Sequence, residues 1–111
     1  MFRVGRKFFI NMMYRNDAKR LKGKRTFGNI NVRADVSYFE DKIKEHKLDI
    51  IYPAENSNGI TILYIHGGSY IYGYKEYSSI FTSYFVSKGF TVVAMNYRLA
   101  DHKHDINVFN Q

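Results

Sequence analysis

Residues 60–69, ITILYIHGGS, form an apolar run that ends at a histidine, two glycines and a serine. Glycine permits sharp turns and lets backbone N–H groups approach a bound group with no Cβ in the way. N–H groups that converge on one point bind negative charge. When that charge is the oxyanion of acyl transfer, each donor stabilises the transition state by about 3–4 kcal/mol. Gly67, Gly68 and Ser69 are therefore candidate oxyanion-hole residues.

Other interpretations of this segment stay open. The glycines could form an ordinary tight turn, and a histidine such as His66 is more often a hydrogen-bonded structural residue than a catalytic one. Tyr70, Tyr72 and Tyr74 could line a substrate pocket or simply pack. A phosphate site at the start of a helix is a further use of such a loop. The sequence contains neither G-x-G-x-x-G nor Gly-Lys-Ser/Thr, so a nucleotide site has little support.

The flanking residues predict a strand–helix–strand unit over 60–96. Residues 60–65 are almost continuously apolar, as in strands that are buried on both faces. Apolar residues then recur at helical spacing over 75–88, and Gly89 is the glycine expected after a helix. The predicted apolar stripe consists of Tyr77, Ile80, Phe81, Tyr84 and Phe85. A second buried strand is predicted over 90–95. Sites in parallel α/β sheets form at the carboxyl ends of strands, where the two glycines lie.

The first half of the chain gives weaker signals. Residues 2–22 suit a helix with a broad apolar face, and residues 26–33 are interpreted as a connector. Val36 and Tyr38, with Phe39 beside them, weakly indicate a first strand. Alternation over residues 48–52 predicts a half-buried second strand.

Positive charge is concentrated at the N-terminus. Residues 1–25 carry nine Lys or Arg and one acidic residue, whereas the rest of the chain is close to neutral. This segment could be the solvated face of a helix that packs over the site entrance. It could also make a weak contact with an anionic membrane surface, while nucleic acid is unlikely because no recognition motif is present. No apolar stretch approaches the ~20 residues of a membrane helix, and no signal-peptide cleavage site follows, so a cytoplasmic protein is predicted. The chain has no cysteine, which excludes disulfides and thiolate chemistry.

Two motifs now carry a resemblance. LYIHGGSYIYG (63–73) and VVAMNYRLA (92–100) are similar to the α/β-hydrolase superfamily, in the esterase/lipase branch with a His-Gly-Gly-X oxyanion motif. HKLDIIYPAENSNG (46–59) resembles the second strand and turn of that branch. The resemblance covers roughly residues 36–100. It implies an α/β fold that is the N-terminal portion of an α/β-hydrolase, with a mostly parallel sheet whose strand order begins 1-2-4-3-5.

The resemblance also implies roles. Backbone N–H groups of the glycine loop form the oxyanion hole, with Gly68 and Ser69 as the favoured donors. His66 would stabilise the loop and would not be the catalytic histidine, and Tyr97 with Arg98 would form a structural pair after the fourth strand. The implied substrate is a small-molecule ester, and no cofactor or metal is implied.

The catalytic residues of such a hydrolase are not found in the sequence. The nucleophile would lie on a G-x-S-x-G elbow, followed by an acid and a histidine, and no G-x-S-x-G is present. The chain is therefore predicted to be an inactive N-terminal piece of a longer esterase. The alternative is a non-catalytic module that binds an anionic surface through residues 1–25. If no fifth strand pairs with it, strand 60–65 is an open and aggregation-prone edge.

Three regions are predicted. Residues 1–25 form a basic helical segment, residues 34–100 form a partial α/β-hydrolase domain, and residues 101–111 form a polar tail. Asp101 and His102 stand where the family usually has proline and glutamate. With His104 and Asp105 they match no standard zinc spacing, so a solvated tail is expected and not a metal site.

Overall fold

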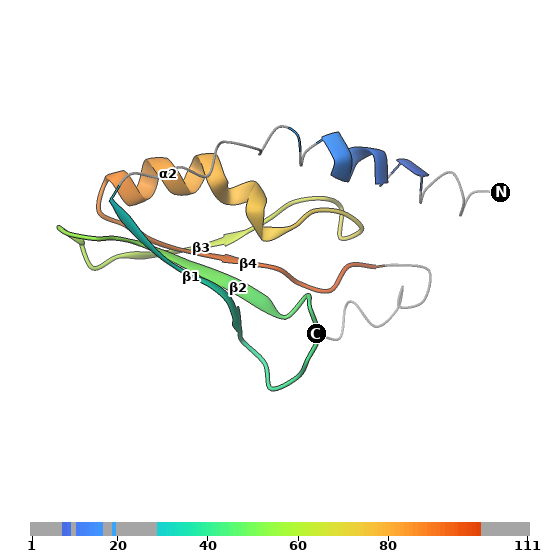
Figure 1. Ribbon diagram of the computed structural model, residues 1–111, viewed down its shortest axis with the longest axis horizontal. Coiled ribbons are helices and arrows are strands. Elements are labelled where there is room, and N and C mark those ends of the chain that lie inside the picture. The colour runs from blue at the N-terminus through green and yellow to red at the C-terminus, as the bar shows by residue number, and fades with distance from the viewer. Residues whose placement is uncertain (1–7, 10, 17–18, 20–28, 101–111) are drawn as a thin grey trace.

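The computed structural model describes residues 8–9, 11–16, 19 and 29–100. The predictions for the remaining residues, including the polar tail, lie outside these ranges. The elements follow in the order β1 (Ile30–Ser37), β2 (Lys47–Pro53), β3 (Thr61–Ile65), the 3₁₀ helix η1 (Lys75–Ser78), α2 (Ser79–Ser87) and β4 (Thr91–Met95) (Figure 1). Residues 8, 9, 11–16 and 19 are also helical, as predicted. None of the helices in the described part of the chain is long and apolar enough to cross a membrane.

The sheet is mixed, so the prediction of a mostly parallel sheet is wrong. The strand order is β1-β2-β4-β3, which agrees with the expected 1-2-4-3. Among the described strands only β3 and β4 pair in parallel, while β1 with β2 and β2 with β4 pair antiparallel. A parallel pair needs a crossover connection, and η1 with α2 provides one between β3 and β4. β1 and β2 are joined by residues 38–46 without a crossover helix, as antiparallel neighbours can be.

The first strand begins earlier than its residues suggested. β1 starts at Ile30, so residues 30–33 are not a connector, and Tyr38 and Phe39 lie beyond its end. The pairing of β1 with β2 shifts register between Arg33 and Val36, where Asp35 has a φ of 53°. This bulge interrupts the alternation, and most of the strand is exposed. Its apolar periodicity is therefore too weak to predict its bounds.

The core lies between α2 and one face of the sheet. It consists of Ile51, Val86, Val92 and Ala94, with Ile30, Ile62, Tyr64 and Phe85 packed against it. α2 ends as predicted, because Gly89 has a φ of 92° and its N–H donates to the carbonyl of Val86 at 3.0 Å.

The predicted apolar stripe of α2 is only partly correct. Ser79, Thr82 and Val86 are the buried residues of this helix, whereas Ile80 and Tyr84 are exposed. Small side chains on the buried side let the helix approach the sheet closely. The larger ring of Phe81 packs at the flank, 5.3 Å from the ring of Tyr64.

The other face of the sheet is apolar and lacks a covering helix in the described part of the chain (Figure 1). Leu63 and Ile65 of the edge strand β3 are 56% and 59% exposed. They are in register with Val93 and Met95 of β4, whose side chains therefore lie on the same face. β3 thus combines a free edge in the described sheet with exposed apolar side chains, a pattern that promotes association.

We expect this edge to make the chain self-associate as its concentration rises. Leu63→Lys should suppress association, because a charge on an edge strand opposes strand addition. Ile80→Lys is the matched control, since Ile80 is 63% exposed but lies on α2. Light scattering coupled to size-exclusion chromatography measures the effect. Equal suppression by both variants would show that general hydrophobicity, and not the strand edge, drives association.

Candidate functional site

The residues after β3 form a tight turn with unusual backbone angles. The N–H of Ile71 donates to the carbonyl of Gly68 at 3.1 Å, which closes a four-residue turn. Its two central residues, Ser69 and Tyr70, have φ values of 53° and 62°. Turns with positive φ at both central positions normally use glycine or asparagine. A non-glycine residue there costs roughly 1–2 kcal/mol, and such strain is concentrated at functional sites.

Two glycines let the loop fold back on itself. Gly68 has a φ of 137°, and a Cβ at this position would lie 1.7 Å from the carbonyl oxygen of Tyr72. Gly73 has a φ of 113°, and a Cβ there would lie 2.3 Å from Nδ1 of His66. A Cβ at Gly67 would meet no atom within 4 Å. The loop therefore requires glycine at 68 and 73, whereas position 67 has space for a side chain.

The side chain of His66 stabilises the loop through a hydrogen bond. Its side chain is buried, and Nδ1 lies 2.8 Å from the carbonyl oxygen of Gly67. A carbonyl only accepts, so Nδ1 carries the proton. Burial lowers the pKa of His66, and the bond to Gly67 opposes this only in part, so the ring is neutral at pH 7.

Tyr97 fixes the other side of the same histidine. Its ring stacks on the imidazole at 4.3 Å between centroids, and its hydroxyl donates to the backbone carbonyl of His66 at 2.6 Å. Burial, followed by the proximity of Tyr70, raises the pKa of Tyr97, so the phenol stays protonated and able to donate. The strand-end residues of β3 and β4 are thereby locked together.

The orientation of one loop amide follows from this arrangement. In a trans peptide the C=O and the next N–H point in opposite directions, and the described chain has no cis peptide. Because the carbonyl of Gly67 points at the imidazole, the N–H of Gly68 points away from it. The N–H groups of Gly67, Gly68 and Ser69 donate to no residue that the structure describes. They are not engaged in ladder or helix bonding, as the predicted oxyanion hole requires.

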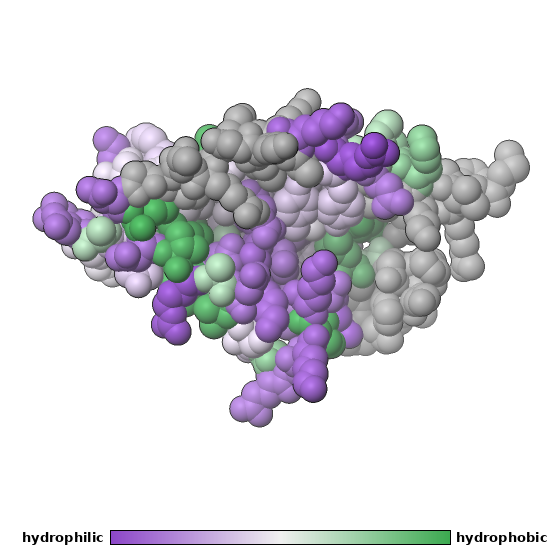
Figure 2. Space-filling model, viewed as in Figure 1, coloured by the Kyte–Doolittle hydropathy of each residue, from purple (hydrophilic) through white to green (hydrophobic). Residues whose placement is uncertain are grey.

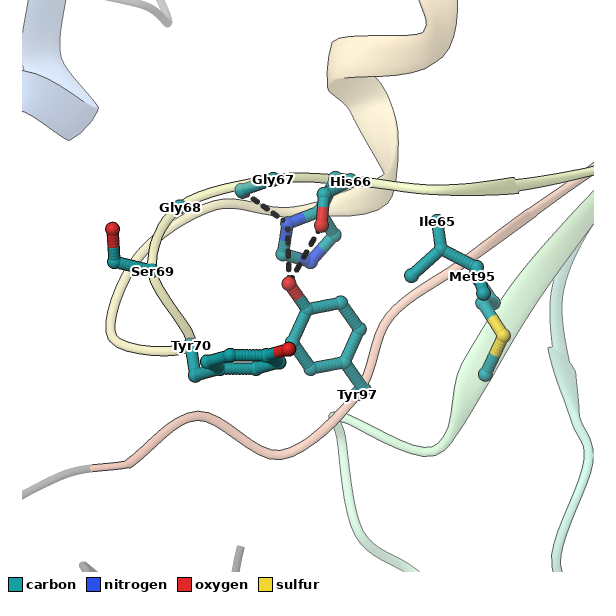
Figure 3. Close-up of a pocket in the computed structure, with 8 residues that line it drawn as sticks. All are labelled: Ile65, His66, Gly67, Gly68, Ser69, Tyr70, Met95 and Tyr97. Atoms are coloured by element: carbon teal, nitrogen blue, oxygen red, sulfur yellow. Dashed lines mark hydrogen bonds between the residues drawn. The ribbon is translucent and has the colours of Figure 1, made fainter. Parts of the chain in front are cut away.

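These residues border a cavity of about 480 Å³, within the range of small-molecule sites. Figure 3 shows the loop on one side of the view, Ile65 and Met95 on the other, and the stacked rings of His66 and Tyr97 between them. The lining residues are Ile65, His66, Gly67, Gly68, Ser69, Tyr70, Met95 and Tyr97.

Most of the predicted site residues meet at this cavity, but three do not. Tyr72 and Tyr74 pack instead with Tyr77 and with Tyr14 of the N-terminal helix, at centroid distances of 4.4–5.7 Å. Arg98 is half-buried and is not among the lining residues. Of the three tyrosines expected as pocket residues, only Tyr70 borders this cavity.

Two lining residues escaped the sequence analysis. Ile65 and Met95 are partners in the parallel register of β3 and β4, so their side chains lie together on one face. The sequence does indicate both residues, since each is the last apolar residue of a predicted buried strand. If the ends of the two predicted strands are aligned as parallel neighbours, Ile65 and Met95 lie side by side.

The sequence analysis also did not predict a buried ion cluster at Lys75. Lys75 is 4% exposed, and its Nζ lies 2.8 Å from Asp49, 3.0 Å from Asp35 and 3.0 Å from Glu76. Burial lowers the pKa of Lys75, but the hydrogen bonds to these carboxylates outweigh it and raise the pKa overall. The backbone N–H of Lys75 donates to Oδ1 of Asn96 at 2.7 Å. The cluster thus ties the far end of the glycine loop to β1, β2 and β4.

Metal ligands are not assembled in the described ranges, where no three His, Cys, Asp or Glu side chains are grouped as a metal ion would require. Asp101, His102, His104 and Asp105 of the predicted tail lie outside these ranges.

The buried histidine gives a testable pH dependence. The pKa of His66 lies below its ordinary 6.5 in the folded protein, so the unfolded chain binds the proton first. Stability should therefore be constant above about pH 6.5 and fall as the pH decreases toward the folded-state pKa. His66→Asn should remove this part of the pH dependence. Urea midpoints of both proteins between about pH 8 and about pH 5 measure it. Parallel curves for the two proteins would contradict the expectation.

Comparisons with known proteins find a matching family model and similar solved structures. The sequence model of a family described as BD-FAE matches residues 48–106. No curated protein matches the chain. Among solved structures, esterase B from Lactobacillus Rhamnosis (HN001) is similar with a TM-score of 0.69 and 24% identity over 87% of this chain. The same esterase inhibited with a C4-C4 SN3 tributyrin phosphonate gives a TM-score of 0.66 and 26% identity over 81% of this chain. A bacterial heroin esterase gives 0.52 and 24% over 87%.

The chain spans about a third of the length of these structures. It covers 33% of the first, 31% of the second and 29% of the third. These similarities establish the α/β-hydrolase fold for the part of the chain that is aligned, and the residues matched by the family model, 48–106, include the strand-end loop.

Proposed function

Because this chain belongs to the BD-FAE family, we propose that its glycine loop is the oxyanion-hole part of a carboxylic-ester hydrolase. The observation that carries the proposal is that the N–H groups of Gly67, Gly68 and Ser69 donate to none of the described residues and belong to a loop that borders a cavity at the end of β3. Backbone donors of this kind stabilise the negative oxygen that forms when an ester carbonyl is attacked.

The chain's own residues have distinct parts in this chemistry. Gly68 and Ser69 donate to the carbonyl oxygen as it becomes an oxyanion. His66 positions the loop and does not act as the base in this proposal: with Nδ1 donating to Gly67, its basic nitrogen is Nε2, and that atom is buried. We propose that the nucleophile, acid and base come from sequence other than these 111 residues, since no G-x-S-x-G occurs among them.

A short acyl group fits the proposal best. The cavity is about 480 Å³ and is bordered by apolar side chains of Ile65, Met95 and Tyr70. One similar structure is an esterase inhibited with a C4-C4 tributyrin phosphonate. A butyl-sized chain is therefore our proposed acyl class.

An amide titration tests the oxyanion hole directly. Butylphosphonate, a tetrahedral anion, is added to ¹⁵N-labelled protein while backbone amide signals are followed. The amides of Gly68 and Ser69 should shift most. Gly89 is the internal control, because its N–H already donates to the carbonyl of Val86 at 3.0 Å. Loop amides that shift no more than Gly89 would refute the proposed role.

An ester assay tests the second part of the proposal. The chain alone should hydrolyse nitrophenyl butyrate no faster than buffer, because its sequence contains no G-x-S-x-G nucleophile elbow. Turnover that co-purifies with the chain would refute the claim that the catalytic residues lie elsewhere.

A further inference from the structure

The N-terminal helix is attached to the glycine loop through one side chain. The hydroxyl of Tyr14 donates to the carbonyl of Gly73 at 3.3 Å, and its ring lies 4.8 Å from Tyr72 and 5.4 Å from Tyr74. Burial is the largest effect on Tyr14 and raises its pKa, as expected for a side chain that faces the protein. Figure 1 shows this helix beside the loop that follows β3. Tyr14 therefore marks the inward side of the helix.

The outward side carries large apolar residues in solvent. Phe8 is 72% exposed, Phe9 55% and Met12 42%. Helical spacing places residues 8, 12, 15 and 19 along one side of a helix. Exposed Arg15 and Lys19 thus continue the line that begins with Phe8 and Met12. In Figure 2 pale green, apolar atoms lie beside purple ones over this helix. Packing within the described chain does not account for two exposed phenylalanines on one turn.

Charge identifies the kind of surface that this side would meet. Residues 1–25 hold nine of the 17 basic residues and one acid, and they supply more than the whole net charge of +7. Phenylalanine and methionine on one side of a helix, with lysine and arginine adjoining them, suit the boundary between anionic headgroups and acyl chains. Duplex nucleic acid would use the basic residues through its phosphates but would leave the exposed rings without a role.

We propose that the N-terminal helix lies in the interface of an anionic lipid bilayer. Phe8, Phe9 and Met12 enter the boundary of the acyl chains, and Arg15 and Lys19 contact lipid phosphates. This surface contact does not depend on the proposed hydrolase role. One consequence does rest on that role: since Tyr14 joins the helix to the glycine loop, esters dissolved in the membrane would be held close to the cavity.

Flotation with lipid vesicles tests the proposal on the whole 111-residue chain, because aggregated protein does not float. Vesicles of phosphatidylcholine alone are compared with vesicles that contain about a quarter phosphatidylglycerol. Each is measured at about 0.05 M and about 0.5 M salt. We expect binding to the anionic vesicles to exceed binding to the neutral ones by about tenfold at low salt and to weaken at high salt. Failure to bind anionic vesicles, or equal binding to both, overturns the proposal.

Two double variants separate lipid insertion from charge and from general hydrophobicity. Phe8→Ser with Phe9→Ser should lower vesicle binding by about tenfold. Ile80→Ser with Tyr84→Ser, two residues of α2 that are 63% and 59% exposed, should leave it unchanged. Far-ultraviolet circular dichroism checks that each variant folds. Full binding by the phenylalanine variant, equal loss in both variants, or tighter binding to duplex DNA than to anionic vesicles each overturn the proposal.

Discussion

Gly68→Ala is expected to destabilise the protein by about 3 kcal/mol or more. The new Cβ would lie 1.7 Å from the carbonyl oxygen of Tyr72, which is backbone and cannot swing aside. The φ of 137° is also outside the range that alanine tolerates. The loop must open to relieve both, and the turn closed by Ile71 should be lost with it. Urea unfolding gives the change in free energy, and amide signals of residues 66–73 report the loop.

Gly67→Ala is the matched control one position away. It adds the same methyl group, but no atom lies within 4 Å of its Cβ and its φ is not in the left-handed region. A change within about 1 kcal/mol is expected. If the two variants unfold at the same urea concentration, the closed form of the loop is not the form in solution. The amide shifts that butylphosphonate causes in the loop should survive in Gly67→Ala and disappear in Gly68→Ala.

Local patterns predicted the part of the molecule that carries the site. The apolar run over residues 60–65 and the glycines at 67 and 68 are short-range signals, since buried strands and tight turns each select particular residue types. They predicted the end of the strand and the turn that follows it. Gly89 was predictable for the same reason, because the left-handed backbone angle that follows the end of α2 favours glycine.

Features that depend on distant contacts were not predictable in this way. The helical spacing of α2 allowed several faces, and the sheet selected the one with Ser79, Thr82 and Val86 because small residues permit close packing. The direction in which two strands pair depends on which strands become neighbours in the sheet. The residues of a single strand do not determine this. Tyr72 and Tyr74 alternate with Tyr70, yet they turn toward Tyr14, a residue almost sixty positions earlier.

Lys75→Met should be the second severe substitution, with an expected loss of about 3–5 kcal/mol. Its ammonium group is 4% exposed and lies within 3.0 Å of three carboxylates, of which Asp49 is 17% exposed. Methionine keeps most of the side-chain volume but leaves the Asp49 carboxylate without its cation. Breaking one partner of a buried ion pair costs more than the pair contributes when intact, because a lone charge remains. Lys44→Met, at an exposed position, should change stability by no more than about 0.5 kcal/mol.

The double variant Lys75→Met with Asp49→Asn distinguishes a lost charge partner from lost packing. If the unpaired carboxylate causes the instability, asparagine should recover part of it, and the double-mutant cycle will not be additive. An additive cycle would assign the loss to packing.

The pH dependence gives an independent check, because the raised pKa of Lys75 means that the folded protein keeps this proton to a higher pH than the unfolded chain does. The stability difference between wild type and Lys75→Met should be constant below the ordinary pKa of 10.5 and shrink at higher pH. Because the Lys75 side chain anchors the end of the glycine loop to Asp35 of β1 and Asp49 of β2, loop amides of Lys75→Met should also lose their response to butylphosphonate, whereas those of Lys44→Met should keep it.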